Sequence, residues 1–337
     1  MTQTPRILGT GSAVPEGRLT NDELAARFAA TRPHVTAEWI EAKTGVVERR
    51  VSRPGVEAER NSRLAAEASR QALDMAGLDP TALDVVVYAT CTPDTLIPSA
   101  ASWLQRHLGA PHAWAFDLNA ACAGFLQGLA VARSLLLSGA ARTALVLGAD
   151  VITAFVDPDD HRTAVLFGDG AGAVVLSSEG EAGILRLLDT RAGSHAERND
   201  DVVVPAGGSA RPGRTGCRAP REFTMHMRGR AVREAAMDLI PRSCAETLDA
   251  HGLAQSDIDW LVPHQANLRI VEAVADTLGV PRVRVATNIQ RRGNTSGATV
   301  PTLLDGLVRS GRLQPQQTLL AASFGAGYTF ATALLRS

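Results

Sequence analysis

Short apolar runs alternate along the chain with longer segments in which apolar residues recur at helical spacing. The runs at 85–89, 114–118 and 260–262 predict strands, and the Ala- and Leu-rich segments around them predict helices. Strands that alternate with helices indicate βαβ units and a mostly parallel sheet with covered faces. The segment from about Cys122 to Ser138 is apolar almost all round, which predicts a buried helix.

An internal repeat relates the two halves of the chain. Residues 73–87 align with 248–262 at an offset of 175, with six of fifteen positions identical, and the same offset places Asn119 on Asn294. The helix that matches 122–138 starts near Gly297 and carries Pro301 in its first turn, where proline is tolerated. We therefore expect an α/β fold duplicated over 1–175 and 176–337, with two buried helices between two sheets in a five-layer α/β/α/β/α sandwich.

Two polar stretches rich in Gly, Pro and Arg, at about 29–62 and 190–222, predict loops or insertions. Loops of this length in compact domains are often functional, although simple connections fit the composition equally well.

Composition and charge exclude several classes of function. The 337 residues carry a formal net charge of −1 and have no basic run, so neither nucleic acid nor an anionic membrane is an expected partner. The first residues lack the pattern of a signal peptide, and no apolar stretch reaches the length of a membrane span. We expect a cytoplasmic protein. Its four cysteines are far apart, without Cys-x-x-Cys pairs or histidines at metal spacing, so neither disulfides nor a metal site is expected.

Cys122 is the candidate nucleophile. It follows the strand at 114–118 and opens the buried helix, where the positive end of the helix dipole would stabilise a thiolate and lower the pKa of the thiol. The alternative is a packed core cysteine. Cys91, Cys217 and Cys244 have no comparable setting.

His264 and Asn294 are candidate partners of this thiol. His264 ends a strand where the repeat places Ala89 in the first half, and Asn294 lies at the counterpart of the turn that carries Cys122. A pseudo-twofold axis should therefore bring Asn294 close to Cys122. Neutral His and Asn side chains suit a developing oxyanion better than a metal ion. The segment 324–327, Phe-Gly-Ala-Gly, follows the last apolar strand and could offer backbone N–H groups, whereas the other glycine clusters lack the spacing of a dinucleotide fingerprint.

These residues belong to a set of motifs that occur in order along nearly the whole chain. The chain resembles the ketoacyl-acyl-carrier-protein synthase III family of the thiolase fold, through Leu8-Gly-Thr-Gly-Ser, Glu38-Trp-Ile, Ala120-Ala-Cys-Ala-Gly124, Phe167-Gly-Asp-Gly-Ala-Gly172, Pro263-His-Gln-Ala-Asn-Leu-Arg269, Gly293-Asn-Thr-Ser and Phe324-Gly-Ala-Gly.

The resemblance implies a homodimeric acyltransferase that works by ping-pong chemistry. Cys122 would take an acyl group from a coenzyme A thioester, and His264 and Asn294 would stabilise the enolate formed when a malonyl thioester loses CO₂. The product would be a 3-oxoacyl thioester that initiates fatty-acid or specialised-metabolite chains. The malonyl donor would be malonyl-acyl carrier protein or malonyl-CoA. No cofactor is implied, and the oxyanion hole would consist of the backbone N–H groups of Cys122 and Ala326.

The resemblance also implies ligand contacts. Coenzyme A would be bound by Trp39, Lys43, Arg162, Asn267 and Arg269. Lys43 is the only lysine beside 33 arginines and stands where the family usually has arginine. The pair His161-Arg162 stands where an arginine precedes a small residue, so which of the two reaches the ligand is open.

Two further features concern the acyl pocket and the partner. Phe324 and Ile97 would line the acyl pocket; Ile97 lies in the segment that the family lends to the partner subunit and replaces a frequent Phe, which predicts primers longer or more branched than acetyl. The carrier protein would dock on a basic group whose location differs from the family's, since Glu272 and Asp276 stand where lysines are frequent; its residues are Arg228, Arg230, Arg233 and Arg269.

Two other functions stay open from the sequence. One is a relative that passes the acyl group from Cys122 to a small-molecule alcohol or amine instead of condensing it. The other is an inactive subunit of a heterodimer, against which the presence of Cys122, His264 and Asn294 argues.

Overall fold

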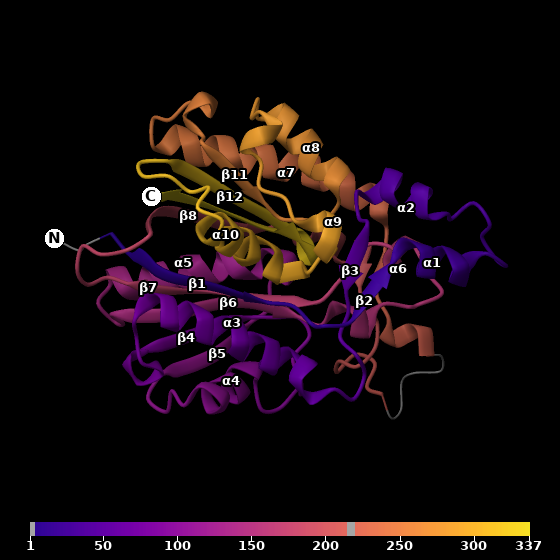
Figure 1. Ribbon diagram of the computed structural model, residues 1–337, viewed down its shortest axis with the longest axis horizontal. Coiled ribbons are helices and arrows are strands. Elements are labelled where there is room, and N and C mark those ends of the chain that lie inside the picture. Colours follow the sequence, from indigo (N-terminus) through magenta and orange to yellow (C-terminus); the bar gives the residue numbers. More distant parts are fainter. Residues whose placement is uncertain (1–3, 214–219) are drawn as a thin grey trace.

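The computed structural model describes residues 4–213 and 220–337, and in these residues the two halves each build one side of a large mixed sheet (Figure 1). The strand order is β11-β12-β13-β8-β1-β7-β6-β4-β5. The first half supplies β1 (Arg6–Ala13), β4 (Val85–Ala89), β5 (Trp114–Leu118), β6 (Thr143–Asp150) and β7 (Gly170–Ser177). The second half supplies β8 (Leu185–Ser194), β11 (Trp260–Pro263), β12 (Thr318–Gly325) and β13 (Thr329–Arg336). The two sides are joined into one sheet where Arg6 and Ile7 of β1 pair with β8.

Two helices lie between the sides of this sheet, as the sequence predicts (Figure 1). Helices α5 (Gly124–Leu137) and α10 (Thr299–Arg309) share one apolar core with strands of both halves. Helices α3 (Asn61–Ala76) and α4 (Ala100–Leu108) cover the outer face of the first half, and α7 (Gly229–Ala250) and α8 (Leu268–Thr277) cover that of the second. The expected five-layer α/β/α/β/α arrangement of the thiolase fold is confirmed.

The duplication is visible in backbone detail at the offset of 175. The 3₁₀ turns η2 (Pro80–Ala82) and η7 (Gln255–Asp257) are equivalent, and so are η3 (Ala121–Ala123) and η9 (Ser296–Ala298). Asp84 accepts the backbone N–H of Thr143 at 3.0 Å, and its counterpart Asp259 accepts that of Thr318 at 2.8 Å. The repeat therefore places the Cys122 turn and the turn after Asn294 in matching positions, at the inner ends of α5 and α10.

Both predicted loops contain regular structure that the sequence analysis missed. Segment 29–62 holds α2 (Ala37–Thr44), which Thr36 caps and Gly45 ends with a φ of 75°, and β3 (Glu48–Arg50), which pairs with β2 (Arg18–Thr20). Segment 190–222 holds the end of β8, η5 (Ala196–Asp201) and β9 (Val202–Val203), which pairs with β10 (His226–Met227). Elements this short carry too few residues for a periodic signal. Part of the second segment, including Cys217, lies outside the described residues.

Other boundaries shift by a few residues. Helix α5 begins at Gly124, because Cys122 belongs to the preceding 3₁₀ turn, and β7 continues to Ser177, past the division expected at 175. The remaining elements are α1 (Asn21–Phe28), η1 (Glu57–Glu59), η4 (Ile152–Phe155), α6 (His161–Ala164), η6 (Pro220–Phe223), η8 (Arg282–Arg284), α9 (Ile289–Arg292) and η10 (Ala326–Tyr328). In the described part of the chain, no helix has the length and apolar character needed to cross a membrane.

Candidate active site

The three candidate catalytic residues line one cavity of about 1390 Å³ where the two halves meet. Cys122 follows the carboxyl end of β5, His264 follows that of β11, and Asn294 precedes the turn that leads into α10. Parallel strands present their carboxyl ends at one edge, and the duplication turns the two edges toward each other. The expectation that these residues converge is therefore met in the structure.

Cys122 is half-buried in the cavity wall, and the desolvation of its thiol changes the expected electrostatics. Burial raises its pKa from 9 to about 12, while a contact with the Ser296 hydroxyl, whose oxygen lies 3.6 Å from Sγ, acts in the opposite direction. The pKa of Cys122 is therefore not lowered as the position at the helix start predicted, because desolvation is the largest effect. The resting thiol is therefore protonated near neutral pH, and its proton must leave as it reacts.

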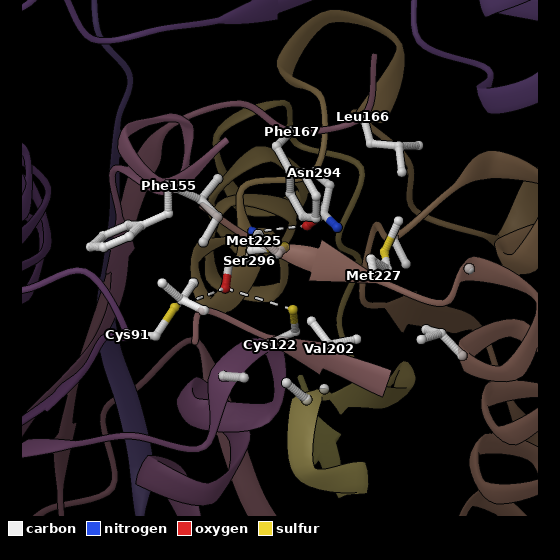
Figure 2. Close-up of a pocket in the computed structure, with 18 of the residues that line it drawn as sticks. Cys91, Cys122, Phe155, Leu166, Phe167, Val202, Met225, Met227, Asn294 and Ser296 are labelled. Atoms are coloured by element: carbon white, nitrogen blue, oxygen red, sulfur yellow. Dashed lines mark hydrogen bonds between the residues drawn. The ribbon is translucent and has the colours of Figure 1, made fainter. Parts of the chain in front are cut away.

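Asn294 is oriented by its own turn. Its Oδ1 accepts the backbone N–H of Ser296 at 2.9 Å, and its backbone N–H donates to Leu166 O at 2.9 Å. Because Oδ1 is engaged, the Nδ2 group is turned away from Ser296 and toward the cavity, as Figure 2 shows. Asn294 therefore presents two N–H donors to a ligand in the cavity.

His264 is 6% exposed and electrically neutral. Burial lowers its pKa from 6.5 to about 3, so the ring carries one proton at any pH near neutrality. Its backbone N–H donates to Ala322 O at 2.8 Å, and its Nδ1 lies 2.7 Å from the hydroxyl oxygen of Thr299, the first residue of α10.

A buried carboxylate that the sequence analysis missed joins the two halves behind the site. Asp150, at the end of β6, accepts the backbone N–H of Cys91 at 2.9 Å and that of Gly297 at 3.1 Å. Cys91 follows β4 as Cys122 follows β5, and its Sγ lies 3.8 Å from the Ser296 hydroxyl oxygen (Figure 2). The position of Cys91 after a strand parallel to β5 was the signal that could have placed it here.

The turn at 324–327 lies against the Cys122 turn. A Cβ on Gly325 would come within 2.7 Å of the Cys122 backbone nitrogen, and Thr329 donates to Ala120 O at 2.8 Å, which fixes the approach. Ala326 and Cys122 both line the cavity. Their role as oxyanion donors stays a prediction.

One wall of the cavity is apolar (Figure 2). Phe324 belongs to it and packs edge-on against Tyr328. The short β9–β10 sheet, absent from the sequence analysis, supplies much of the rest; the wall includes Ile152, Phe155, Phe167, Val202, Val204, Met225 and Met227. Ile97 is 90% exposed and does not line the cavity of its own chain. Its predicted place in the acyl pocket therefore requires a second subunit.

The five predicted coenzyme A contacts all line the mouth of the cavity, but their side chains differ in availability. The Arg162 guanidinium forms a two-point ion pair with Asp160, at 2.8 and 2.7 Å. The Arg269 side chain donates to Ala42 O, and Asn267 donates to Lys43 O at 3.1 Å, so both hold the end of α2 in place. Lys43 itself is exposed and forms no ion pair with a described residue.

The side chains of the neighbours His161 and Arg162 have different surroundings. The His161 ring lies 6.1 Å from the Trp39 ring, and the His34 ring lies about as far from both, at 5.9 and 6.0 Å. Of the two neighbours, His161 thus shares the aromatic face at the mouth with Trp39, while Arg162 turns to Asp160.

Three of the four predicted docking arginines lie at the start of α7, and the fourth, Arg269, lies on α8. Arg228 pairs with Asp201 at 3.3 Å and Arg230 with Glu234 at 2.9 Å. Arg230 and Arg233 line the cavity mouth, as Arg269 does from α8. Cations in the first turns of a helix oppose its dipole, so these arginines are not there to stabilise α7.

Comparison with known proteins agrees with this geometry. The model of the 3-oxoacyl-[acyl-carrier-protein] synthase III family matches residues 116–196, and that of its C-terminal part matches residues 248–337. The β-ketoacyl-[acyl-carrier-protein] synthase III of Methylococcus capsulatus is 41% identical over 100% of both chains, and that of Xanthomonas campestris pv. campestris is 44% identical over 98% of both.

Solved structures give the same result. The 3-oxoacyl-(acyl carrier protein) synthase III of Pseudomonas aeruginosa is 38% identical, with a TM-score of 0.87 over 99% of this chain and 98% of that one. A priming β-ketosynthase of a polyketide biosynthetic pathway is 33% identical, with a TM-score of 0.86 over 99% and 96%. The chain belongs to the β-ketoacyl-[acyl-carrier-protein] synthase III family of acyltransferases.

Proposed function

We propose that the protein condenses an acyl-CoA primer with a malonyl thioester through an acyl-cysteine at Cys122. The observation that carries this proposal is the convergence of a half-buried thiol, a neutral imidazole and an oriented amide on one cavity with an apolar wall. The charged mouth suits a coenzyme A moiety, and the apolar wall suits an acyl chain.

In the first half-reaction, the Cys122 sulfur attacks the thioester carbonyl carbon and coenzyme A leaves as its thiol. Because the pKa of Cys122 is about 12, the attack needs a proton acceptor, and the neutral ring of His264 is the candidate in the cavity. The backbone N–H groups of Cys122 and Ala326 are the proposed donors to the oxyanion.

In the second half-reaction, the malonyl thioester loses CO₂ and its carbonyl oxygen becomes an enolate. Asn294 Nδ2 supplies an N–H donor for that oxygen, and His264 supplies a second one when Nε2 carries the proton. The carbanion carbon then attacks the acyl-cysteine, which releases the Cys122 sulfur and gives the 3-oxoacyl product. Both donors are neutral, so in this step hydrogen bonds, and not a charged group, stabilise the negative charge on the enolate oxygen.

The proposal includes a homodimer and an acidic carrier as partners. Strand β5 forms an edge of the sheet, and Trp114 on it is exposed, as are Leu96 and Ile97 on a nearby loop. Apolar residues so placed favour pairing with a second copy. Arg230, Arg233 and Arg269 give the cavity mouth positive charge that suits an acidic carrier protein.

The test is to incubate the protein with acyl-CoA and malonyl-acyl carrier protein, and to follow the acyl-enzyme by intact mass and CO₂ by its release from labelled malonyl donor. We expect an acyl adduct that is lost in Cys122→Ala, followed by CO₂ and 3-oxoacyl product. An adduct without CO₂ would overturn the condensation in favour of transfer to a small-molecule nucleophile. No adduct with any acyl-CoA would exclude both.

A further inference from the structure

Among the described residues, the His264 ring has one polar side-chain partner, the hydroxyl group of Thr299. The Thr299 oxygen lies 2.7 Å from Nδ1 of His264 and 3.0 Å from the backbone oxygen of Ser296. All three groups are buried. The hydroxyl group has a single proton to share between these two neighbours.

The direction of each hydrogen bond follows from what the groups can do. The Ser296 backbone oxygen can only accept, so the Thr299 hydroxyl donates its proton there. It can then only accept from His264, which places the imidazole proton on Nδ1. Turning the hydroxyl toward Nδ1 instead would remove one of the two donors to the buried Ser296 oxygen and leave it only the backbone N–H of Thr299.

Thr299 lies in the first turn of α10, where further hydroxyl contacts involve its backbone and not its side chain. Thr302 donates from its hydroxyl to Thr299 O at 2.9 Å, and Asn288 Nδ2 donates to the Thr302 hydroxyl at 3.1 Å. At the offset of 175, Thr299 corresponds to Gly124, the first residue of α5. The second half therefore carries at this position a hydroxyl group that the first half lacks.

We propose that Thr299 is a positioning residue that holds His264 in the Nδ1–H tautomer in the free enzyme, so that Nε2 offers a lone pair to the cavity. This inference rests on the proposed function for its consequence. In the acylation step, Nε2 accepts the Cys122 thiol proton, the sulfur forms a bond to the carbonyl carbon, and the bond from that carbon to the coenzyme A sulfur breaks. The proton then passes from Nε2 to the departing coenzyme A thiolate, which returns the ring to its neutral Nδ1–H form.

The test reads the tautomer directly, by ¹⁵N chemical shifts of the histidine side chains in uniformly ¹⁵N-labelled protein near pH 7. The His264 signals are assigned by their loss in His264→Gln. We expect a protonated Nδ1 and an unprotonated Nε2 in the unaltered protein and in Thr299→Ser, which keeps the hydroxyl. In Thr299→Val, a buried N–H on Nδ1 would have no acceptor, so we expect the proton to move to Nε2.

Thr302→Val is the matched control, because it removes a buried hydroxyl from the same helical turn without touching His264. We expect it to keep the Nδ1–H tautomer. Should Thr299→Val fail to fold, Thr299→Ala makes the same measurement. A protonated Nε2 in the unaltered protein, or an unchanged tautomer in both Thr299→Val and Thr299→Ala, would overturn the proposal.

Kinetics add a readout that a structural defect would not produce. Thr299→Val should lower the rate of Cys122 acylation by about tenfold or more, as expected when a base loses its free lone pair. Decarboxylation of the malonyl donor without primer should not fall, because a proton on Nε2 supplies the N–H donor that this step uses. Equal losses in both half-reactions would contradict the assignment. If the protein forms no acyl-enzyme at all, the proposed function fails while the tautomer measurement still decides the role of Thr299.

Discussion

The Ser296 hydroxyl oxygen lies 3.6 Å from the sulfur of Cys122, and these residues belong to equivalent turns of the two halves. Both turns carry a residue with positive φ, 47° at Ala121 and 50° at Ser296, at matching positions. Burial raises the pKa of Cys122 to about 12, and the hydrogen bond with Ser296 opposes that rise. One half thus moderates the reactivity of the thiol carried by the other.

Ser296→Ala should make Cys122 less reactive, because the hydrogen bond that favours the thiolate is lost while the burial remains. Each unit added to the pKa of the thiol lowers the thiolate fraction about tenfold at a fixed pH. Iodoacetamide labelling of Cys122, followed by intact mass between pH 8 and 10, should be slower in the variant at every pH. Ser243→Ala, which removes a buried hydroxyl that does not line the cavity, should label at the unaltered rate. Equal rates in Ser296→Ala and Ser243→Ala would show that Ser296 does not tune the thiol.

The sequence predicted the site well where a residue's place followed from the repeat. Cys122 and Asn294 were found together because one duplication puts both at a turn before a buried helix. The pKa of Cys122 was predicted in the wrong direction, since the helix dipole was considered without the desolvation that accompanies a layer of buried helices. Asp150 was missed because its importance arises from a contact across the two halves, and Thr299 because its contact with His264 depends on how the start of α10 packs against the end of β11; one sequence reveals neither.

Asn294→Ala should leave acylation of Cys122 intact and lose decarboxylation by roughly 10²–10³-fold, the usual effect of removing one oxyanion donor. Asn294→Asp keeps the oxygen that accepts the Ser296 backbone N–H but puts a carboxylate oxygen in place of the N–H donor, so it should lose decarboxylation at least as strongly. Both should behave alike when acyl-enzyme is measured by mass and CO₂ by release. Normal condensation by either variant would remove Asn294 from the second half-reaction.

Lys43→Ala should raise the KM for acyl-CoA several-fold with little change in kcat. Lys43 is an exposed cation at the cavity mouth without an ion-pair partner among the described residues, so its charge is available to a phosphate group. Lys43→Arg keeps that charge and should stay within a factor of about two. The comparison is made by steady-state kinetics at low salt, where screening is weak. If KM in Lys43→Ala does not move, the lysine does not contact the ligand.

Ile97→Phe should narrow the range of acyl primers. Ile97 is exposed on its own chain and does not line its cavity, so it reaches an acyl pocket only across a dimer. Isoleucine is smaller than the phenylalanine introduced in the variant, so the unaltered pocket has more room for the acyl chain. We expect the unaltered protein to take primers longer or more branched than acetyl, and the variant to shift toward acetyl. Acylation is measured by intact mass across a panel of acyl-CoA thioesters, beside sedimentation to establish the dimer. A protein that accepts acetyl-CoA alone, or one that is monomeric, would exclude this role.

The burial of His264 should be visible in the pH dependence of stability. Its pKa is about 3 in the folded protein and about 6.5 in an unfolded chain, so between these values the unfolded state binds more protons. The free energy of unfolding therefore falls as the pH drops from 6.5 toward 3 and is unaffected by this group above 6.5, which amounts to a loss of about 2 kcal/mol from pH 7 to pH 5.

His264→Gln removes that titration, so its stability should fall by about 2 kcal/mol less over the same pH range. Asp169, whose pKa burial raises to about 6, acts in the opposite direction, but it is present in both proteins and cancels in the comparison. Urea unfolding at pH 5 and 7 gives the two differences, and His112→Gln, at an exposed histidine, should match the unaltered protein. A His264→Gln protein with an unaltered pH dependence would mean that the pKa of His264 is the same in the folded and unfolded states, and would contradict the conclusion that burial keeps this ring neutral at pH 5.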